Sequence, residues 1–148
     1  MKARARFLDY VLSQLEKPAL WGAKGEDAFD CSGLVTCGIR EAGGPDLRLT
    51  HNADKLAHET RPLLATERPI PGDLIFFDGD SNGVAEHVGI VKDMKTAIDA
   101  EGATHLVTNI EEAKRRNARV RLHGSLAYRP RGRIHRNTYL DALDFVSQ

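Results

Sequence analysis

The chain has 148 residues, 41% of them hydrophobic, which is enough for one compact domain with a single core. Its 21 basic residues balance its 21 acidic residues, so net charge does not draw the protein to nucleic acid or to an anionic membrane. It contains no apolar run of about 18 residues, which excludes a transmembrane helix and predicts no membrane insertion.

Helices are predicted in the first half of the chain. Apolar side chains recur at helical spacing over residues 7–15, and Pro18 is expected to end this first helix. Residues 30–46 predict a second helix, with Asp30 as its N-cap and two glycines and a proline at its end. A third, shorter helix is predicted over residues 51–60.

Strands are predicted in the second half, where β-rich runs alternate with turn residues: 74–77, 87–92, 96–100, 105–109 and 119–122. Helices followed by strands predict an α+β fold, with N-terminal helices packed on a central antiparallel β-sheet. The tail, residues 138–148, is predicted to form a last short helix. Neither a repeat nor a linker divides the chain, so residues 1–148 are predicted to form one domain.

Two cysteines are present, Cys31 and Cys37, which are too few for a disulfide framework and lack the paired spacing of a zinc site. On one helix they would lie about 9 Å apart along its axis, too far for a disulfide, so each is expected to be a free thiol. Cys31 would occupy the first helical turn, where the helix dipole and free N–H groups stabilise a nucleophilic thiolate. Position alone leaves open that Cys31 is a small buried apolar residue, the interpretation we favour for Cys37.

A nucleophilic cysteine needs a base, commonly a histidine. His87 is the candidate because it opens a strand, HVGIV, in which the small Gly89 lets another backbone or a ligand come close. His105 begins an apolar run and is ambiguous. The other histidines have polar or charged neighbours and are expected on the surface: His51, His58, His123 and His135.

A carboxylate could orient this histidine. A hairpin centred near Met94 would place His87 opposite Glu101, with Asp99 as a diagonal neighbour on the same face of the sheet. Either carboxylate could accept the imidazole N–H and stabilise the imidazolium. Both could also be solvated at a strand end, and spacing alone does not choose between them.

Three strings, FDCSGLV (29–35), PGDLIFF (71–77) and HVGIV (87–91), together resemble the NlpC/P60 family. The resemblance implies a papain-like core, spanning about residues 18–133, in which the cysteine lies on a helix and the histidine on an antiparallel sheet. The family's third catalytic position lies twelve residues beyond the first histidine, which implies the triad Cys31, His87 and Asp99.

The resemblance also suggests substrate contacts. In family members that cut next to a free N-terminus, the Asp-Cys-Ser stretch helps bind the substrate amine, so Asp30 and Ser32 are candidates, with helix capping as their alternative role. Trp21 belongs to a segment similar to the family's Tyr-x-Trp-Gly and is either a core anchor or a subsite wall. Ala19 stands where that tyrosine is common, and the tyrosine's hydroxyl lines the family's site.

The activity that the resemblance implies is that of a cysteine peptidase. Such an enzyme cuts peptidoglycan stem peptides between γ-linked D-glutamate and a diamino acid, and it requires neither a metal nor an organic cofactor. Two alternatives remain: an amidase or acyltransferase on the same Cys-His core, or an inactive module for wall binding or tail assembly.

The N-terminal segment starts with basic residues, but polar residues interrupt its apolar stretch before signal-peptide length. We therefore expect a protein made in the cytoplasm that acts at the cell wall, either as a phage tail or lysis component or after delivery by a secretion machine. Residues 104–148 match no motif.

Overall fold

The three helices predicted near the N-terminus are confirmed by the computed structural model, which describes residues 2–146. They are α1 (Ala3–Ser13), α2 (Cys31–Glu41) and α3 (Ala53–Glu59). The carboxylate of Asp30 caps α2 by accepting the Gly33 N–H at 2.6 Å. The first helix ends at Ser13, earlier than the expected limit at Pro18.

The sheet has six strands, all antiparallel, in the order β1-β6-β2-β3-β4-β5. Their bounds are β1 (Arg61–Pro62), β2 (Leu74–Phe77), β3 (His87–Val91), β4 (Ala97–Glu101), β5 (Arg119–His123) and β6 (Gly132–Arg136). The expectation of an α+β fold with an antiparallel sheet is therefore confirmed. In the part of the chain that the structure describes, no helix is long and apolar enough to cross a membrane.

One predicted strand is wrong. Residues 105–109 form a turn and the approach to α4 (Ile110–Arg116), because the Asn109 side chain accepts the Glu112 N–H at 2.8 Å and caps that helix. Strand β6 was not predicted, since its arginines mask the alternation of apolar residues. The last helix, α5 (Thr138–Val146), agrees with the prediction as far as it is described, and residues 147–148 lie outside the described part.

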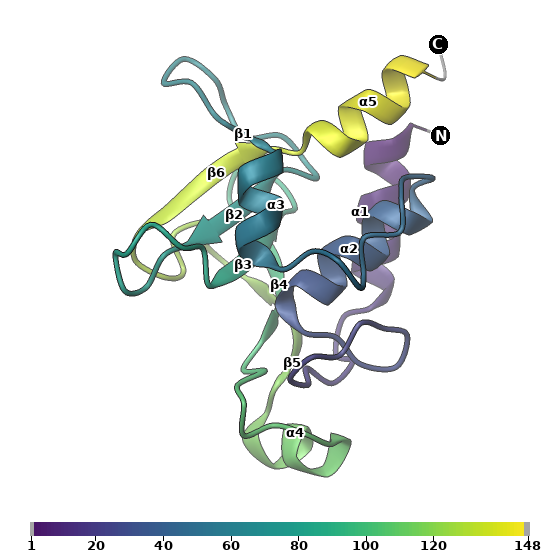
Figure 1. Cartoon of the computed structure of the whole chain (residues 1–148), viewed down its shortest axis with the longest axis vertical. Helices are drawn as coiled ribbons and strands as arrows, with labels where there is room; N and C mark the ends of the chain where they lie inside the picture. Colours follow the sequence, from purple (N-terminus) through teal and green to yellow (C-terminus); the bar gives the residue numbers. More distant parts are fainter. Residues whose placement is uncertain (1, 147–148) are drawn as a thin grey trace.

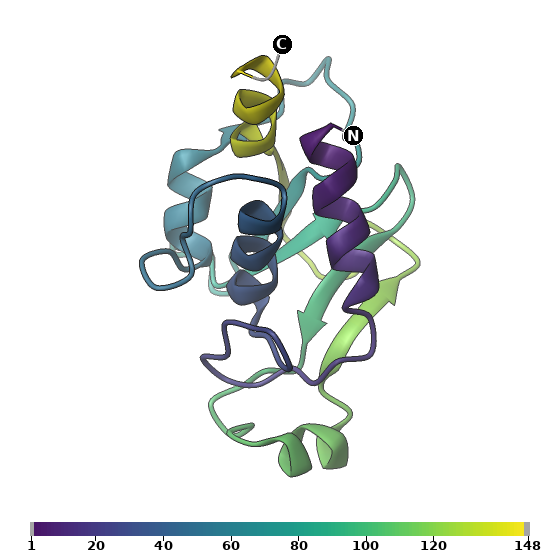
Figure 2. The same ribbon diagram turned by 90° about the vertical axis from the view of Figure 1, so that its right-hand side faces the viewer.

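Helix α2 packs on β3 and β4, and α1 packs beside it (Figures 1 and 2). Its residues from Ser32 to Ile39 are all buried. The core between the layers includes fully buried side chains from each: Phe7, Leu34, Leu74, Ile90 and Ile98. This packing brings the first turn of α2 close to β3.

A buried carboxylate connects α1 with strand β6 of the sheet. Asp73 is fully buried, and its side chain pairs with Arg4 of α1 at 3.1 Å and with Arg136 of β6 at 3.0 Å. It also accepts the backbone N–H groups of Ile70 and Asn137. Asp73 thus serves the turn before β2, and its contacts join α1, β2 and β6.

Replacing Asp73 tests this bridge. Asp73→Ala should lower the free energy of unfolding by about 3–5 kcal/mol, because it removes a buried carboxylate that pairs with two guanidinium groups and accepts two backbone N–H groups. Urea unfolding measures the loss. Asp9→Ala, which removes an exposed carboxylate on α1, is the matched control and should change stability little. Equal stability of the two variants would contradict this role.

Candidate active site

Cys31 is the first residue of α2 and lines a cleft of about 760 Å³. Both cysteines are free thiols, as predicted. His87, the first residue of β3, lines the same cleft and is 8% exposed. The packing of α2 on β3 therefore brings together the two residues that the sequence separates by more than fifty positions.

The predicted hairpin register is confirmed. Strands β3 and β4 pair Ile90 with Ile98 and Val91 with Ala97. This is the register expected for a hairpin centred near Met94. His87 Nε2 lies 2.6 Å from Asp99 Oδ2, so Asp99 is the carboxylate that contacts the imidazole. The bond to Asp99 leaves Nδ1 of the ring for the cysteine. Glu101, the alternative left open by the sequence, accepts a hydrogen bond from Arg129 instead.

The environment of His87 favours the charged imidazolium. Burial opposes the charge, but hydrogen bonding to Asp99 and to Cys31 outweighs it and raises the pKa of His87 from 6.5 to about 9. At neutral pH the ring therefore holds a proton. Because the folded-state pKa is the higher one, this interaction stabilises the fold fully below about pH 6.5, and that stability is lost as the pH rises through about 9.

Asp99 is held from a second side by residues that the sequence did not reveal. It is 1% exposed; its Oδ1 lies 2.7 Å from His123 Nε2, and its Oδ2 accepts the Tyr128 hydroxyl at 2.9 Å. The Tyr128 ring stacks on His123 with centroids 3.9 Å apart. Burial opposes ionisation of Asp99, but the hydrogen bonds from His123 and His87 lower its pKa well below the usual range.

Gly89 was the one sequence signal for this arrangement. A Cβ atom at Gly89 would lie 2.5 Å from the Tyr128 hydroxyl oxygen, so a glycine is needed for the tyrosine to reach Asp99. A close approach was predicted at Gly89, but the group that makes it is this side chain and not a backbone or a ligand. Gly89 and Tyr128 lie far apart in the sequence, so their contact could not be predicted from spacing.

Several histidines differ from the surface placement predicted for them. His123 contacts Asp99, and His135 is buried with its Nδ1 3.0 Å from the Thr60 hydroxyl. The side chain of His51 is 8% exposed and lies 2.7 Å from Glu59. Among these four residues, only His58 has the exposed side chain that was expected. Polar neighbours in the sequence did not indicate exposure, because each of the other three rings contacts a partner that is not its neighbour in the sequence.

The candidate substrate contacts lie around the thiol. Asp30 and Ser32 line the cleft on either side of Cys31, and both contact the ammonium of Lys24. Trp21 also lines the cleft; its side chain is 60% exposed and meets His105 edge to face at 6.3 Å. Trp21 therefore forms part of the cleft wall and is not a core anchor.

Ala19 is fully buried, and its N–H donates to the Ala118 carbonyl at 3.0 Å. Its methyl side chain offers no hydroxyl to the cleft. Any stabilisation of a reacting carbonyl must therefore come from other donors, of which the backbone N–H of Cys31 at the start of α2 is the nearest by position.

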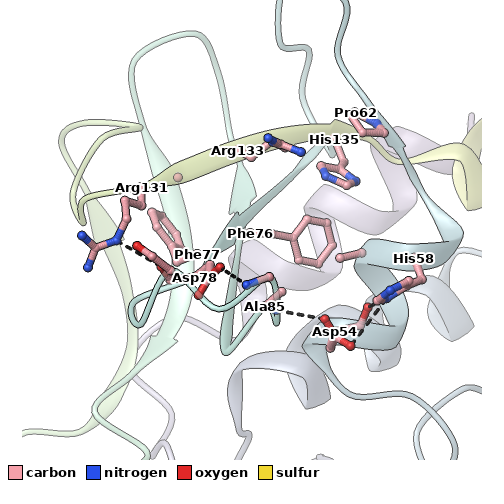
Figure 3. Close-up of a pocket in the computed structure, with 14 residues that line it drawn as sticks. Asp54, His58, Pro62, Phe76, Phe77, Asp78, Ala85, Arg131, Arg133 and His135 are labelled. Atoms are coloured by element: carbon pink, nitrogen blue, oxygen red, sulfur yellow. Dashed lines mark hydrogen bonds and ion pairs between the residues drawn. The ribbon is translucent and has the colours of Figure 1, made fainter.

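A second cavity of about 630 Å³ adjoins the cleft (Figure 3). It contains neither Cys31 nor His87 and shares only Asp54 and Ala85 with the cleft. The Ala85 N–H donates to Asp54 at 2.9 Å, and this hydrogen bond joins α3 to the segment before β3 (Figure 3). The two residues that line both spaces are therefore bonded to each other. Phe76, Arg133 and His135 are among the residues that line this second cavity (Figure 3).

Only one group of three side chains within residues 2–146 could hold a metal ion: His87, Asp99 and Glu101, with donor atoms within 4.8 Å of one another. His87 and Asp99 are already hydrogen-bonded to each other, and Arg129 occupies Glu101. These contacts suit a histidine oriented by a carboxylate, with the cysteine as its other neighbour.

The fold and the site together define the papain-like class, in which a helix bearing the cysteine packs on an antiparallel sheet bearing the histidine. A sequence profile of the NlpC/P60 family matches residues 16–124. The chain belongs to the NlpC/P60 family, as the three motifs had suggested.

Relatives and solved structures agree with this assignment. Probable endopeptidase p60 of Listeria grayi is 38% identical over 97 residues, which are 65% of this chain and 18% of that protein. Murein DD-endopeptidase MepH of Escherichia coli is 32% identical over 92 residues, 60% of this chain and 33% of that protein. The chain thus spans a third or less of these two relatives. The structure of the NlpC/p60 domain of peptidoglycan hydrolase SagA has the same fold, with a TM-score of 0.65 at 20% identity, over 89% of this chain and 96% of that chain.

Two matched substitutions test which carboxylate controls His87. Asp99→Asn should lower the pKa of His87 from about 9 towards 6.5, because the bond to Asp99 is the largest effect that raises it. Glu101→Gln removes a charge from the same face but no bond to His87, and it should lower this pKa less. NMR titration of the His87 ring measures both. A larger shift in Glu101→Gln would identify Glu101 as the partner.

Proposed function

We propose that this protein is a cysteine peptidase that hydrolyses the stem peptides of peptidoglycan. The observation that carries the proposal is His87, held by Asp99 at 2.6 Å and interacting with Cys31 at the N-terminus of α2 inside an open cleft. Family membership and the names of the relatives support the substrate class. In this proposal Cys31 is the nucleophile, His87 the base and Asp99 the residue that orients it.

The proposed reaction has two halves. His87 holds the proton taken from Cys31, and the sulfur attacks the substrate carbonyl to form a carbon–sulfur bond. His87 then gives the proton to the departing amine as the carbon–nitrogen bond breaks, which leaves a thioester. Water attacks the thioester after losing a proton to His87, and the carboxylic acid leaves as Cys31 takes the proton back.

The start of α2 supports the role proposed for its backbone. Asp30 accepts the Gly33 N–H, which leaves the N–H of Cys31 free of a capping partner and facing the helix N-terminus. A negative oxygen forming on the attacked carbonyl would be stabilised there by the N–H and the helix dipole. The Cys31 N–H would stabilise this oxygen without help from a tyrosine hydroxyl, because alanine stands at position 19.

For the scissile bond we propose the link between the γ-carboxyl of D-glutamate and a diamino acid, which the motifs suggest. The name of MepH points to a different bond for that relative, so both bond types belong in the test. Purified muropeptides of the diaminopimelate and lysine types should each be digested, and the products identified by mass spectrometry.

The expected result is a set of new fragments with a free diamino-acid amine, formed by the native chain and not by Cys31→Ala. Thermal unfolding shows whether the variant keeps its fold. Fragments formed equally by both proteins would contradict a cysteine mechanism. Products that appear only with an added acceptor amine would identify an acyltransferase instead.

The absent hydroxyl at Ala19 favours one rival, a module that binds wall peptides without cutting them. This rival predicts that the native chain and Cys31→Ala bind muropeptides equally and that neither forms products. Turnover by the native chain excludes it.

The pH profile gives an independent test. Since the leaving amine takes its proton from His87, kcat/KM should fall as the pH rises through about 9, where the ring loses that proton. In Asp99→Asn this falling limb should move to lower pH, towards the ordinary histidine value. Initial rates on one muropeptide between pH 6 and about 10 measure the limb. A limb that stays in place would show that another group supplies the proton.

A further inference from the structure

The ammonium of Lys24 occupies a polar position beside the nucleophile. Its Nζ lies 2.8 and 3.0 Å from the two carboxylate oxygens of Asp30 and 3.1 Å from the Ser32 hydroxyl. Asp30 and Ser32 flank Cys31 in the chain, and both line the cleft. The three N–H donors of the lysine thus match the three oxygens around this position.

The segment that carries Lys24 is fixed to α2. The thiol of Cys37 donates to the Lys24 carbonyl at 3.0 Å, and the Asp30 N–H donates to the Ala23 carbonyl at 2.7 Å. A Cβ atom at Gly33 would lie 2.3 Å from that carbonyl, so only glycine lets the segment lie against the first turn. Figure 2 shows this segment folding back beside the start of α2. The backbone therefore places the lysine at Asp30.

A carboxylate with a neighbouring hydroxyl also fits any other alkylammonium, and the cleft beside it is open. A substrate with a free amine at this point would have to displace Lys24, whose side chain is 28% exposed and is held by the chain itself. A substrate with an acylated nitrogen brings no charge and need not compete.

We propose that Lys24 determines specificity by filling the ammonium position next to Cys31, so that the enzyme selects stem peptides whose N-terminal nitrogen is acylated over peptides with a free N-terminal amine. The inference rests on the proposed peptidase function and defines its substrate class. The N-terminal nitrogen of a stem peptide is acylated while the peptide is joined to the sugar, so the protein would act on sugar-linked stem peptides and not on peptides freed from the sugar.

The test compares two synthetic peptides, L-alanyl-γ-D-glutamyl-diaminopimelate and its N-acetyl form. The native chain should cleave the acetylated peptide with the higher kcat/KM. Lys24→Met keeps the length of the side chain and removes its charge, and it should raise the ratio of free-amine to acetylated kcat/KM by about tenfold or more. Lys17→Met is the control, because the ammonium of Lys17 contacts the Glu26 carbonyl and not Asp30. An unchanged ratio in Lys24→Met, or a native preference for the free amine, would overturn the proposal.

A binding measurement separates this proposal from the peptidase function. In the Cys31→Ala background, the dipeptide L-alanyl-γ-D-glutamate should bind about tenfold more tightly once Lys24→Met is added, and Asp30→Asn should remove that gain. Calorimetry measures all three variants. If the native chain cleaves neither peptide but binding shows the gain, the peptidase function fails and the role of Lys24 stands. Equal binding, or none, with and without Lys24→Met would reject the role of Lys24.

Discussion

The site depends on one buried charge, the carboxylate of Asp99. Burying a carboxylate is costly unless donors surround it, and here His87, His123 and Tyr128 do so. The sheet order makes this possible, because β4 lies between β3 and β5 and both histidines come from those neighbouring strands. The proton on His87, and with it the proposed chemistry, follows from the charge that this shell keeps on Asp99.

The same charge affects the groups around it. Burial and the nearby charge of Asp99 raise the pKa of Tyr128, so its hydroxyl remains a donor throughout the range in which the protein would work. Burial and Asp99 also raise the pKa of Glu101, while the charge of Arg129 opposes that effect. The pKa values of these two carboxylates on one face of β4 thus shift in opposite directions. Asp99 has histidine donors, whereas Glu101 has the charged Asp99 as its neighbour.

Local sequence rules predicted the parts of the site that depend on short separations. The turn near Met94 sets the pairing of β3 with β4, and even spacing then puts His87 and Asp99 on one face. The N-cap at Asp30 likewise places Cys31 in the first turn of α2. His123 and Tyr128 could not be predicted in this way, since their contacts with Asp99 depend on which strand lies beside β4. Strand β6 was missed for a related reason: its pairing with β2 and β1 stabilises a sequence with weak strand character.

Three aspartates show how the donors around a carboxylate define its role. Asp73 is buried among two arginines and backbone N–H groups, which remain charged or fixed at any working pH, so it can only hold α1 and the sheet together. Asp99 is buried among histidines, whose protons can move, and this suits a part in proton transfer. Asp30 is less buried, faces the cleft and holds an ammonium on a side chain that could be displaced. Its partner resembles a ligand more than a structural counterion, which is why the specificity of the cleft is expected to depend on it.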